Sequence, residues 1–330
     1  MATYKGIKGY TVQSLASDPS PLLEGQVWYN TTSTTLKGSI NVLGTGAWAT
    51  TNTLNHARQQ ADGTGTQTAG LVMGGDYTWP HTYPKWSESY DGTSWTNTND
   101  LIKGRLNAAA TGTLAASLCI GGSDSPAGQM DQVEHWDGTC WSEGTDLLDS
   151  RRAGTAAGTT TAALLAGGSA PGATANVEYY NGTSWSEGAN LNAAKSNLGA
   201  AGVDASAIAF AGTAGGDPYS LATAEQYDGS SWSEVADLNT IRVNIGGAGA
   251  TGTAALAFGG ANDDGDPQAL VESWDGSSWT EVANLSTSRR AIHGSGTNTS
   301  ALAVGGETPP SSNAAEEWNM AASVETIAFD

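Results

Sequence analysis

Ionisable residues of opposite charge recur six times along the chain, and they are the first candidates for chemistry. The basic members are Arg58, Arg105, Arg151, Lys195, Arg242 and Arg289, and the acidic members are Glu88, Glu134, Glu178, Glu225, Glu272 and Glu316. They could form a ring of charges that lines a ligand channel, or buried ion pairs that tie neighbouring strands together. Because a ligand site rarely needs every repeat to be alike, six matched copies favour the structural ion pairs.

Segments that differ between the copies are better candidates for binding, because function concentrates in loops that a constant scaffold positions. These segments cover residues 76–85, 123–131, 169–176, 213–223, 261–269 and 307–314. In the first segment, Trp79, His81 and Tyr83 lie outside the repeat pattern. We predict a contact patch at these three residues. The alternative is an ordinary packed loop.

An acidic stretch in the fifth variable segment could bind calcium through carboxylate oxygens. Its residues are Asp263, Asp264 and Asp266, which we keep as candidate binding residues. The stretch lacks the full series of ligands that a calcium-binding loop carries. A solvated acidic turn is therefore the favoured interpretation, and we predict no metal site.

Arrangements typical of catalysis are missing from this sequence. The histidines at 56, 81, 135 and 293 are scattered, and the two cysteines form no CxxC motif or Cys/His cluster. Cys119 stands where other copies have apolar residues, which indicates a core position. We find no Ser-His-Asp arrangement with supporting context and no phosphate-binding loop. The prediction is a protein without enzymatic activity, metal or cofactor.

The charge balance restricts the possible partners. The net charge is −20, and a surface this acidic repels nucleic-acid phosphates and anionic lipids. No apolar run approaches the ~20 residues of a membrane span, and the N-terminus lacks a signal-peptide pattern. We expect synthesis in a cytoplasm, no nucleic-acid partner and no membrane insertion.

The elements that position these residues form an internal repeat. Each copy contains a tryptophan with a leucine six positions later. The tryptophans are Trp48, Trp95, Trp141, Trp185, Trp232 and Trp279, at intervals of 47, 46, 44, 47 and 47 residues. A small apolar run that ends in glycines follows, and then a Glu-x-aromatic segment with Asp-Gly or Asn-Gly, which predicts a β-hairpin. About four short strands in a period of this length match one blade of a β-propeller.

Blades of this kind cannot bury both faces alone, so stacking around a ring would supply the core. We expect the repeated tryptophans and aromatic residues to pack between neighbouring blades. The alternative role for the tryptophans is stacking against sugars, which requires exposed rings. The variable segments are expected to emerge together on one face of the disc.

The order Gly-Gly, aromatic residue, tryptophan, with a period of roughly fifty residues, resembles the kelch repeat and covers about Gly46 to Trp318. The resemblance implies an all-β fold, a six-bladed kelch-type β-propeller with a small N-terminal β-hairpin extension. Trp48 precedes the first complete copy and no repeat tryptophan follows Trp318, so we expect their strands to pair. Some kelch propellers are copper radical oxidases similar to galactose oxidase. Their site needs two tyrosines, one cross-linked to cysteine, and two converging histidines, whereas the histidines here are scattered.

The two ends of the chain lie outside the repeat. The segment GQVWYN-TTS-TTLKG, residues 25–38, predicts a short hairpin. It resembles openings of structural proteins of marine tailed bacteriophages, some of which carry kelch-like propellers. The C-terminal segment is expected to form one more strand, paired either with residues 1–45 or with a neighbouring subunit.

This organisation predicts an attachment segment (1–45), a six-bladed propeller (46–320) and a C-terminal strand (321–330). We expect a virion structural protein, in a tail fibre or as a capsid appendage, assembled in the host cytoplasm and oligomeric on the particle. Residues 1–45 would bind other virion proteins. The propeller would recognise a host-surface glycan or protein, or decorate the particle. The alternatives are a carbohydrate-active or copper-dependent oxidase on the same fold, and an intracellular kelch adaptor, for which 45 residues leave no room for a partner domain.

Overall fold

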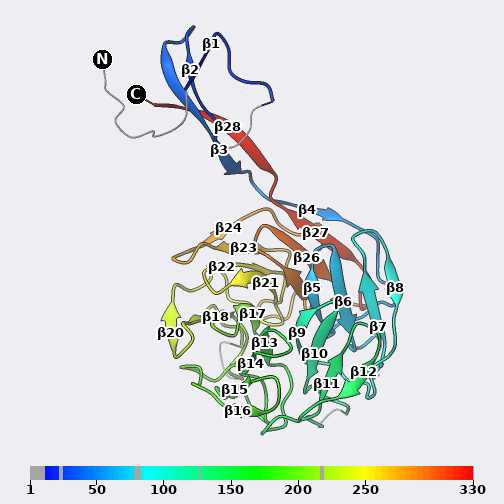
Figure 1. Ribbon diagram of the computed structural model, residues 1–330. Coiled ribbons are helices and arrows are strands. Elements are labelled where there is room, and N and C mark those ends of the chain that lie inside the picture. Colours follow the sequence, from blue (N-terminus) through cyan, green and yellow to red (C-terminus); the bar gives the residue numbers. More distant parts are fainter. Residues whose placement is uncertain (1–11, 22–24, 78–82, 126–127, 216–218, 330) are drawn as a thin grey trace. The chain divides into compact units, whose positions relative to one another are not determined.

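A computed structural model describes residues 12–21, 25–77, 83–125, 128–215 and 219–329. Contacts divide the chain into two units, one formed by residues 1–46 with 320–330 and the other by residues 47–319. Within the described residues, both units contain strands and no helices. The strands form seven four-stranded sheets (Figure 1).

Six of these sheets lie in the unit of residues 47–319 and are antiparallel throughout. The first contains β5 (Asp62–Thr66), β6 (Ala69–Met73), β7 (Ser87–Tyr90) and β8 (Trp95–Asn97), and the second contains β9 (Ala109–Thr113), β10 (Ala116–Ile120), β11 (Val133–Trp136) and β12 (Trp141–Glu143). The third contains β13 (Thr155–Gly158), β14 (Ala163–Ala166), β15 (Val177–Tyr180) and β16 (Trp185–Glu187), and the fourth contains β17 (Gly199–Val203), β18 (Ser206–Phe210), β19 (Ala224–Tyr227) and β20 (Trp232–Val235). The fifth contains β21 (Gly246–Thr251), β22 (Ala254–Phe258), β23 (Val271–Trp274) and β24 (Trp279–Glu281).

The sixth sheet combines strands from both ends of the repeat region. It contains β25 (His293–Gly296), β26 (Ser300–Val304) and β27 (Ala315–Asn319), and its fourth strand is β4 (Ala47–Thr50). β4 pairs with β27 in a register that sets Trp48 opposite Trp318. The pairing expected from the sequence is confirmed. It leaves no unpaired strand where the last repeat meets the first.

The first strands of the six sheets form a closed series of contacts: β5 touches β9, and β13, β17, β21 and β25 follow in turn until β25 touches β5. The residue two positions before each first strand links the series through backbone hydrogen bonds. Each of these six residues donates its backbone N–H to the carbonyl oxygen of the residue before it in the series, at 2.8–3.1 Å. The first residue donates to the last, which completes the series. The six residues are Gln60, Asn107, Ala153, Asn197, Asn244 and Ala291. All six residues have positive φ angles of 50–56°. This arrangement is compatible with a β-propeller-like repeat fold.

The core lies between neighbouring sheets. The second strands are almost wholly buried, and the five tryptophans that begin the fourth strands, Trp95, Trp141, Trp185, Trp232 and Trp279, are only 5–7% exposed. Trp279 of the fifth sheet, for example, meets Phe210 of the fourth sheet edge to face, with ring centroids 5.2 Å apart. The packing role expected for these tryptophans is confirmed, and their burial excludes sugar stacking on them. Cys119 is also buried in the core, as expected.

The other unit contains the seventh sheet, in the order β1 (Gln13–Leu15), β2 (Val27–Asn30), β3 (Thr35–Leu43) and β28 (Ala322–Phe329). β2 and β3 form the expected antiparallel hairpin, whereas β1 pairs with β2 in parallel. β28 pairs with β3 along its whole length. Of the two partners considered for the C-terminal strand, residues 1–45 are therefore the one that the structure shows.

Candidate functional site

The recurring basic residues and glutamates form six buried ion pairs. The pairs are Arg58–Glu88, Arg105–Glu134, Arg151–Glu178, Lys195–Glu225, Arg242–Glu272 and Arg289–Glu316. Each of the twelve residues is at most 2% exposed. Burial lowers the pKa of Arg58, Arg242 and Arg289, and the facing glutamate opposes this shift.

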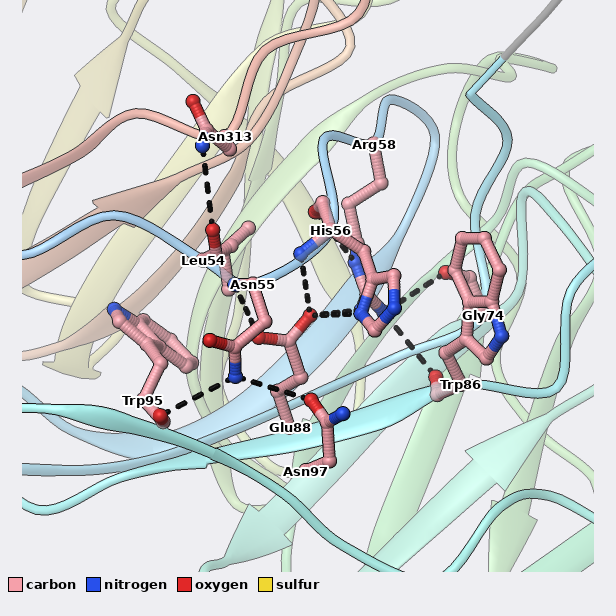
Figure 2. A network of polar contacts seen from close by, with 10 residues as sticks. All are labelled: Leu54, Asn55, His56, Arg58, Gly74, Trp86, Glu88, Trp95, Asn97 and Asn313. Atoms are coloured by element: carbon pink, nitrogen blue, oxygen red, sulfur yellow. Dashed lines mark hydrogen bonds and ion pairs between the residues drawn. The ribbon is translucent and has the colours of Figure 1, made fainter.

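Each basic residue lies on the connection that enters a sheet, and its glutamate lies on the third strand of that sheet. In the first sheet, Arg58 Nη1 donates to the carbonyl oxygens of Gly74 and Trp86, at 3.2 and 3.1 Å (Figure 2). These two residues flank the variable segment between β6 and β7. Glu88 Oε2 accepts the backbone N–H of Asn55 at 2.7 Å. We call this arrangement the loop clamp, because it holds the connection and both ends of the variable segment together.

The loop clamp repeats with the same contacts in four further sheets. None of its charged residues is among those that line the cavity enclosed by the six first strands. The alternative of a charge ring that lines a channel therefore does not apply. The geometry instead gives these five sheets the same hydrogen-bonded base for loops of different sequence.

The fourth sheet departs from this pattern at two positions. Lys195 replaces arginine, and its Nζ reaches Thr223, at 3.5 Å from the carbonyl oxygen and 3.1 Å from Oγ1. Ala211, with φ 60°, stands where the other sheets have the first glycine of the pair. An L-residue with a side chain rarely adopts this conformation, so the backbone there is strained.

The binding residues expected from the sequence are not brought together. Trp79 and His81 lie outside the described residues. Tyr83 is half-buried, and burial raises the pKa of its hydroxyl. Its carbonyl oxygen lies against Gly104, where an added Cβ would be only 1.8 Å away. The contact patch predicted from Trp79, His81 and Tyr83 stays a prediction.

The acidic residues Asp263, Asp264 and Asp266 are exposed. Asp263 Oδ1 accepts the backbone N–H of Ser220 at 2.6 Å, and Asn262 and Asp266 close the turn through their backbones. Within the part of the chain that the structure describes, no three His, Cys, Asp or Glu side chains gather as a metal site would require.

The cavity enclosed by the first strands measures about 370 Å³ and is lined mainly by Gly, Ala, Thr and Ser. One ion pair interrupts this lining, between His293 Nδ1 of β25 and Asp62 of β5, at 2.8 Å. The two residues belong to the last and first sheets, and the equivalent positions elsewhere carry small residues such as Ala109 and Gly199. His293 Nε2 is buried and packs against Gly63. The pair therefore joins two strands rather than presenting a reactive nitrogen to the cavity.

The two cysteines are the remaining nucleophile candidates. Burial raises the pKa of the Cys119 thiol to about 12. A hydrogen bond to Asp137 raises the pKa of the exposed Cys140 thiol. Both shifts disfavour the reactive thiolate.

One side-chain cluster was missed by the sequence analysis. The rings of His56 and Trp86 stack with centroids 4.2 Å apart, and Tyr77 lies 5.2 Å from Trp86. His56 comes from the connection into the first sheet, Tyr77 lies at the start of the variable segment 76–85, and Trp86 directly follows that segment. The sequence does contain a signal for this cluster. The positions that correspond to His56, Tyr77 and Trp86 carry no aromatic residue in the other five copies of the repeat.

Comparisons with protein-family models and with curated proteins gave no match to this chain. Among the described residues, no helix has the length and apolar character needed to cross a membrane. The structure therefore defines the class of protein by its fold alone: an all-β, propeller-like repeat. In five of its sheets the variable loop starts and ends at a loop clamp.

Proposed function

We propose that this chain is a non-enzymatic virion structural protein of a tailed bacteriophage, a tail-fibre component or capsid appendage. Its larger unit, residues 47–319, is a six-bladed kelch-type β-propeller. The small unit attaches it to the particle, and the propeller displays its variable loops for host-surface or glycan recognition. Six copies of the repeat and the circular hydrogen bonds between their connections support six blades. The glycine pairs and buried tryptophans support the kelch type.

The observation that carries the proposal is the unequal distribution of charge between the two units. Residues 1–46 and 320–330 contain three basic and four acidic residues, a net charge of −1. The remaining ten basic and 29 acidic residues give residues 47–319 a net charge of −19. Charge of this size keeps a domain soluble and apart from its neighbours. The nearly neutral unit can approach another protein without that repulsion.

The small sheet also carries an apolar face suited to attachment. Tyr29 of β2 and Phe329 of β28 both lie opposite Leu36 of β3, so the three side chains share one face. Val27 lies two residues from Tyr29 on the same strand, and therefore on that face as well. Val27, Tyr29 and Phe329 are 40%, 37% and 40% exposed. Adjacent exposed apolar side chains of this kind are typical of an interaction surface.

We propose that this face binds an apolar, weakly charged surface of another virion protein. The opposite face is occupied by the chain itself. Trp28 is 1% exposed, and its Nε1 donates to Asp18, which also accepts from Asn30 and Lys37. Only one face is therefore left for a partner.

The contacts of the charged residues that recur in each copy of the repeat support a non-enzymatic role. The glutamates and arginines of the repeat are engaged in loop clamps. The described histidines lie on different elements: His56 on the connection into the first sheet, His135 on β11 and His293 on β25. The competing proposal is a carbohydrate-active or copper-dependent oxidase on the same fold. Stoichiometric copper binding together with oxidase activity of the purified protein would establish that alternative.

Attachment can be tested with purified protein and particles that lack it. The double variant Tyr29→Asp/Phe329→Asp should lose binding to the particle, because it places two charges on the apolar face. The control Ile102→Asp changes an equally exposed apolar residue of the other unit and should bind normally. A cryo-EM map of the particle in which residues 1–45 contact no other virion protein would refute the proposal.

A further inference from the structure

Three aromatic side chains form a stack on the first sheet, His56, Trp86 and Tyr77. The His56 and Trp86 rings are nearly parallel, at 24°, and the Tyr77 and Trp86 rings are inclined by 34°. Figure 2 shows the imidazole of His56 beside the indole of Trp86. The Tyr77 residue is 41% exposed and the His56 side chain 32% exposed. Solvent therefore reaches a surface made largely of ring atoms.

The fold does not require rings at these positions. The equivalent residues are Lys103, Asp124 and Gln132 in the second sheet, Asp149, Ala170 and Asn176 in the third, Ala193, Ala214 and Thr223 in the fourth, Thr240, Asn262 and Leu270 in the fifth, and Thr287, Thr308 and Ala314 in the sixth. In the second sheet two of them form an ion pair at 2.6 Å, and in the third two share a hydrogen bond at 3.4 Å. The five other sheets form the same backbone with other side chains at these three positions. We therefore infer that the aromatic residues of the first sheet have a role other than folding.

The stack is fixed from beneath by the loop clamp. Glu88 Oε1 accepts the backbone N–H of His56 at 3.2 Å and lies 3.3 Å from its Nδ1 (Figure 2). The carbonyl oxygen of Trp86 accepts from Arg58. Because a carboxylate faces Nδ1, the neutral ring carries its proton there, and Nε2 is an acceptor. Among the described residues, Nε2 has no hydrogen-bond partner of its own.

These features match the chemistry of a sugar ring. A pyranose presents a face of C–H groups, which packs on an aromatic surface, and hydroxyl groups at its rim, which need fixed polar partners. Here the aromatic rings supply the surface, and His56 Nε2 and the Tyr77 hydroxyl supply the polar groups. The net charge of −20 opposes glycans that carry carboxylate or sulfate groups.

We propose that His56, Tyr77 and Trp86 form a binding site for a neutral saccharide. The loop clamp holds the backbone and ring of His56 and the backbone of Trp86, so these two residues lose little conformational entropy on binding, which favours recognition of a small ligand. The inference rests on the proposed display function, since it names the ligand class that the propeller would recognise. It uses only residues of the unit 47–319 and does not depend on attachment to a particle.

The test uses the purified full-length chain on an array of neutral, sialylated and sulfated oligosaccharides, followed by calorimetric titration with the best neutral binder. The variant His56→Thr/Tyr77→Asn/Trp86→Leu installs the residues of the fifth sheet, which this backbone already accommodates. We expect its affinity for the neutral saccharide to fall by at least about tenfold. The control Tyr219→Ala removes an exposed aromatic residue from the variable segment between β18 and β19 and should leave the affinity unchanged.

The outcomes separate this inference from the proposed function. Absence of binding to any neutral saccharide, preference for anionic glycans, or equal affinity of the triple variant each overturns the saccharide site. Binding of a host protein that the triple variant loses, without any glycan binding, also overturns it in favour of a protein ligand. The variant Tyr29→Asp/Phe329→Asp should bind the saccharide normally. If it attaches to particles as the wild type does, attachment fails while the saccharide site stands.

Discussion

The backbone N–H of Gln60 donates to the carbonyl oxygen of Ala291 at 3.1 Å, although 231 residues separate them in the sequence. This bond joins the connection into the first sheet to the connection into the last. It completes the circle of six such bonds, so the two ends of the repeat region depend on one another. The strand β4, which precedes Gln60 in the chain, simultaneously completes the last sheet.

Replacing Trp48 should weaken this junction specifically. Its ring lies 5.5 Å from Trp318 within the sixth sheet and 5.2 Å from Phe258 of the fifth sheet. We expect Trp48→Ala to destabilise the protein by about 2–4 kcal/mol, near the lower end of large-to-small changes because the ring is half-buried. Hydrogen exchange should accelerate at the amides of Gln60 and Ala291 more than at Asn197, on the opposite part of the circle. Uniform acceleration at all three amides would contradict a local junction.

The loop clamp should be the most sensitive polar feature of the repeat. Arg242→Met leaves Glu272 buried with an uncompensated charge, and we expect a loss of about 3–5 kcal/mol in the free energy of unfolding. Arg290→Met is the matched control, since Arg290 pairs with Glu307 at a partly exposed site and should cost about 1 kcal/mol or less. Denaturant titration of both variants measures the difference. Equal losses would show that the buried pair has no special role.

The fourth sheet offers the reverse test, a gain in stability. Ala211 adopts φ 60°, and glycine occupies this position in the other five sheets. Ala211→Gly should therefore stabilise the protein by about 0.5–1 kcal/mol, because relief of the left-handed strain exceeds the added entropy of the unfolded chain. Gly259→Ala should destabilise, since a Cβ there would lie 2.6 Å from the carbonyl oxygen of Arg289. A lower unfolding midpoint for Ala211→Gly would count against the strain argument.

Much of this fold is visible in the sequence because its signals are local and repeated. Asp-Gly after a Glu-x-aromatic segment predicts the hairpin of β7 and β8, and matched Arg58 and Glu88 predict their ion pair. The circle of connections is not visible in this way. Three of its six positions carry Asn107, Asn197 and Asn244, a residue type that tolerates positive φ, but Gln60, Ala153 and Ala291 at the other three give no such sign. The hydrogen bonds that link the six positions join residues far apart in the sequence, which no local pattern predicts.

The aromatic stack was missed for a related reason. His56 and Trp86 are 30 residues apart, and the loop clamp brings their segments together. Sequence reasoning favoured Trp79, His81 and Tyr83 because they cluster in one variable segment. A comparison of equivalent positions across the copies, rather than of composition within one loop, would have identified Tyr77 and Trp86.

Acid sensitivity should originate in the hairpin turns between the third and fourth strands. Hydrogen bonds lower the pKa of two turn aspartates, Asp228 and Asp275, from 3.8 to about 2. The main cause at Asp228 is the hydrogen bond donated by the Ser231 backbone, and at Asp275 it is the one donated by the Ser277 side chain. Because the folded pKa lies below the unfolded one, this stability is complete above pH 3.8 and is lost as the pH falls toward 2. The third sheet already uses Asn181 in the same turn, where its Oδ1 accepts two backbone N–H groups.

The double variant Asp228→Asn/Asp275→Asn should therefore keep the turns and remove their share of the acid sensitivity. Denaturant unfolding measures the free energy of unfolding at pH 5 and at pH 2.5. Between these two pH values that free energy should fall less for this variant than for the wild type. Asp264→Asn, which changes an exposed carboxylate outside the hairpins, serves as the control and should preserve the wild-type drop. If the double variant and the control lost stability equally on acidification, the turn aspartates would not be the source of the effect.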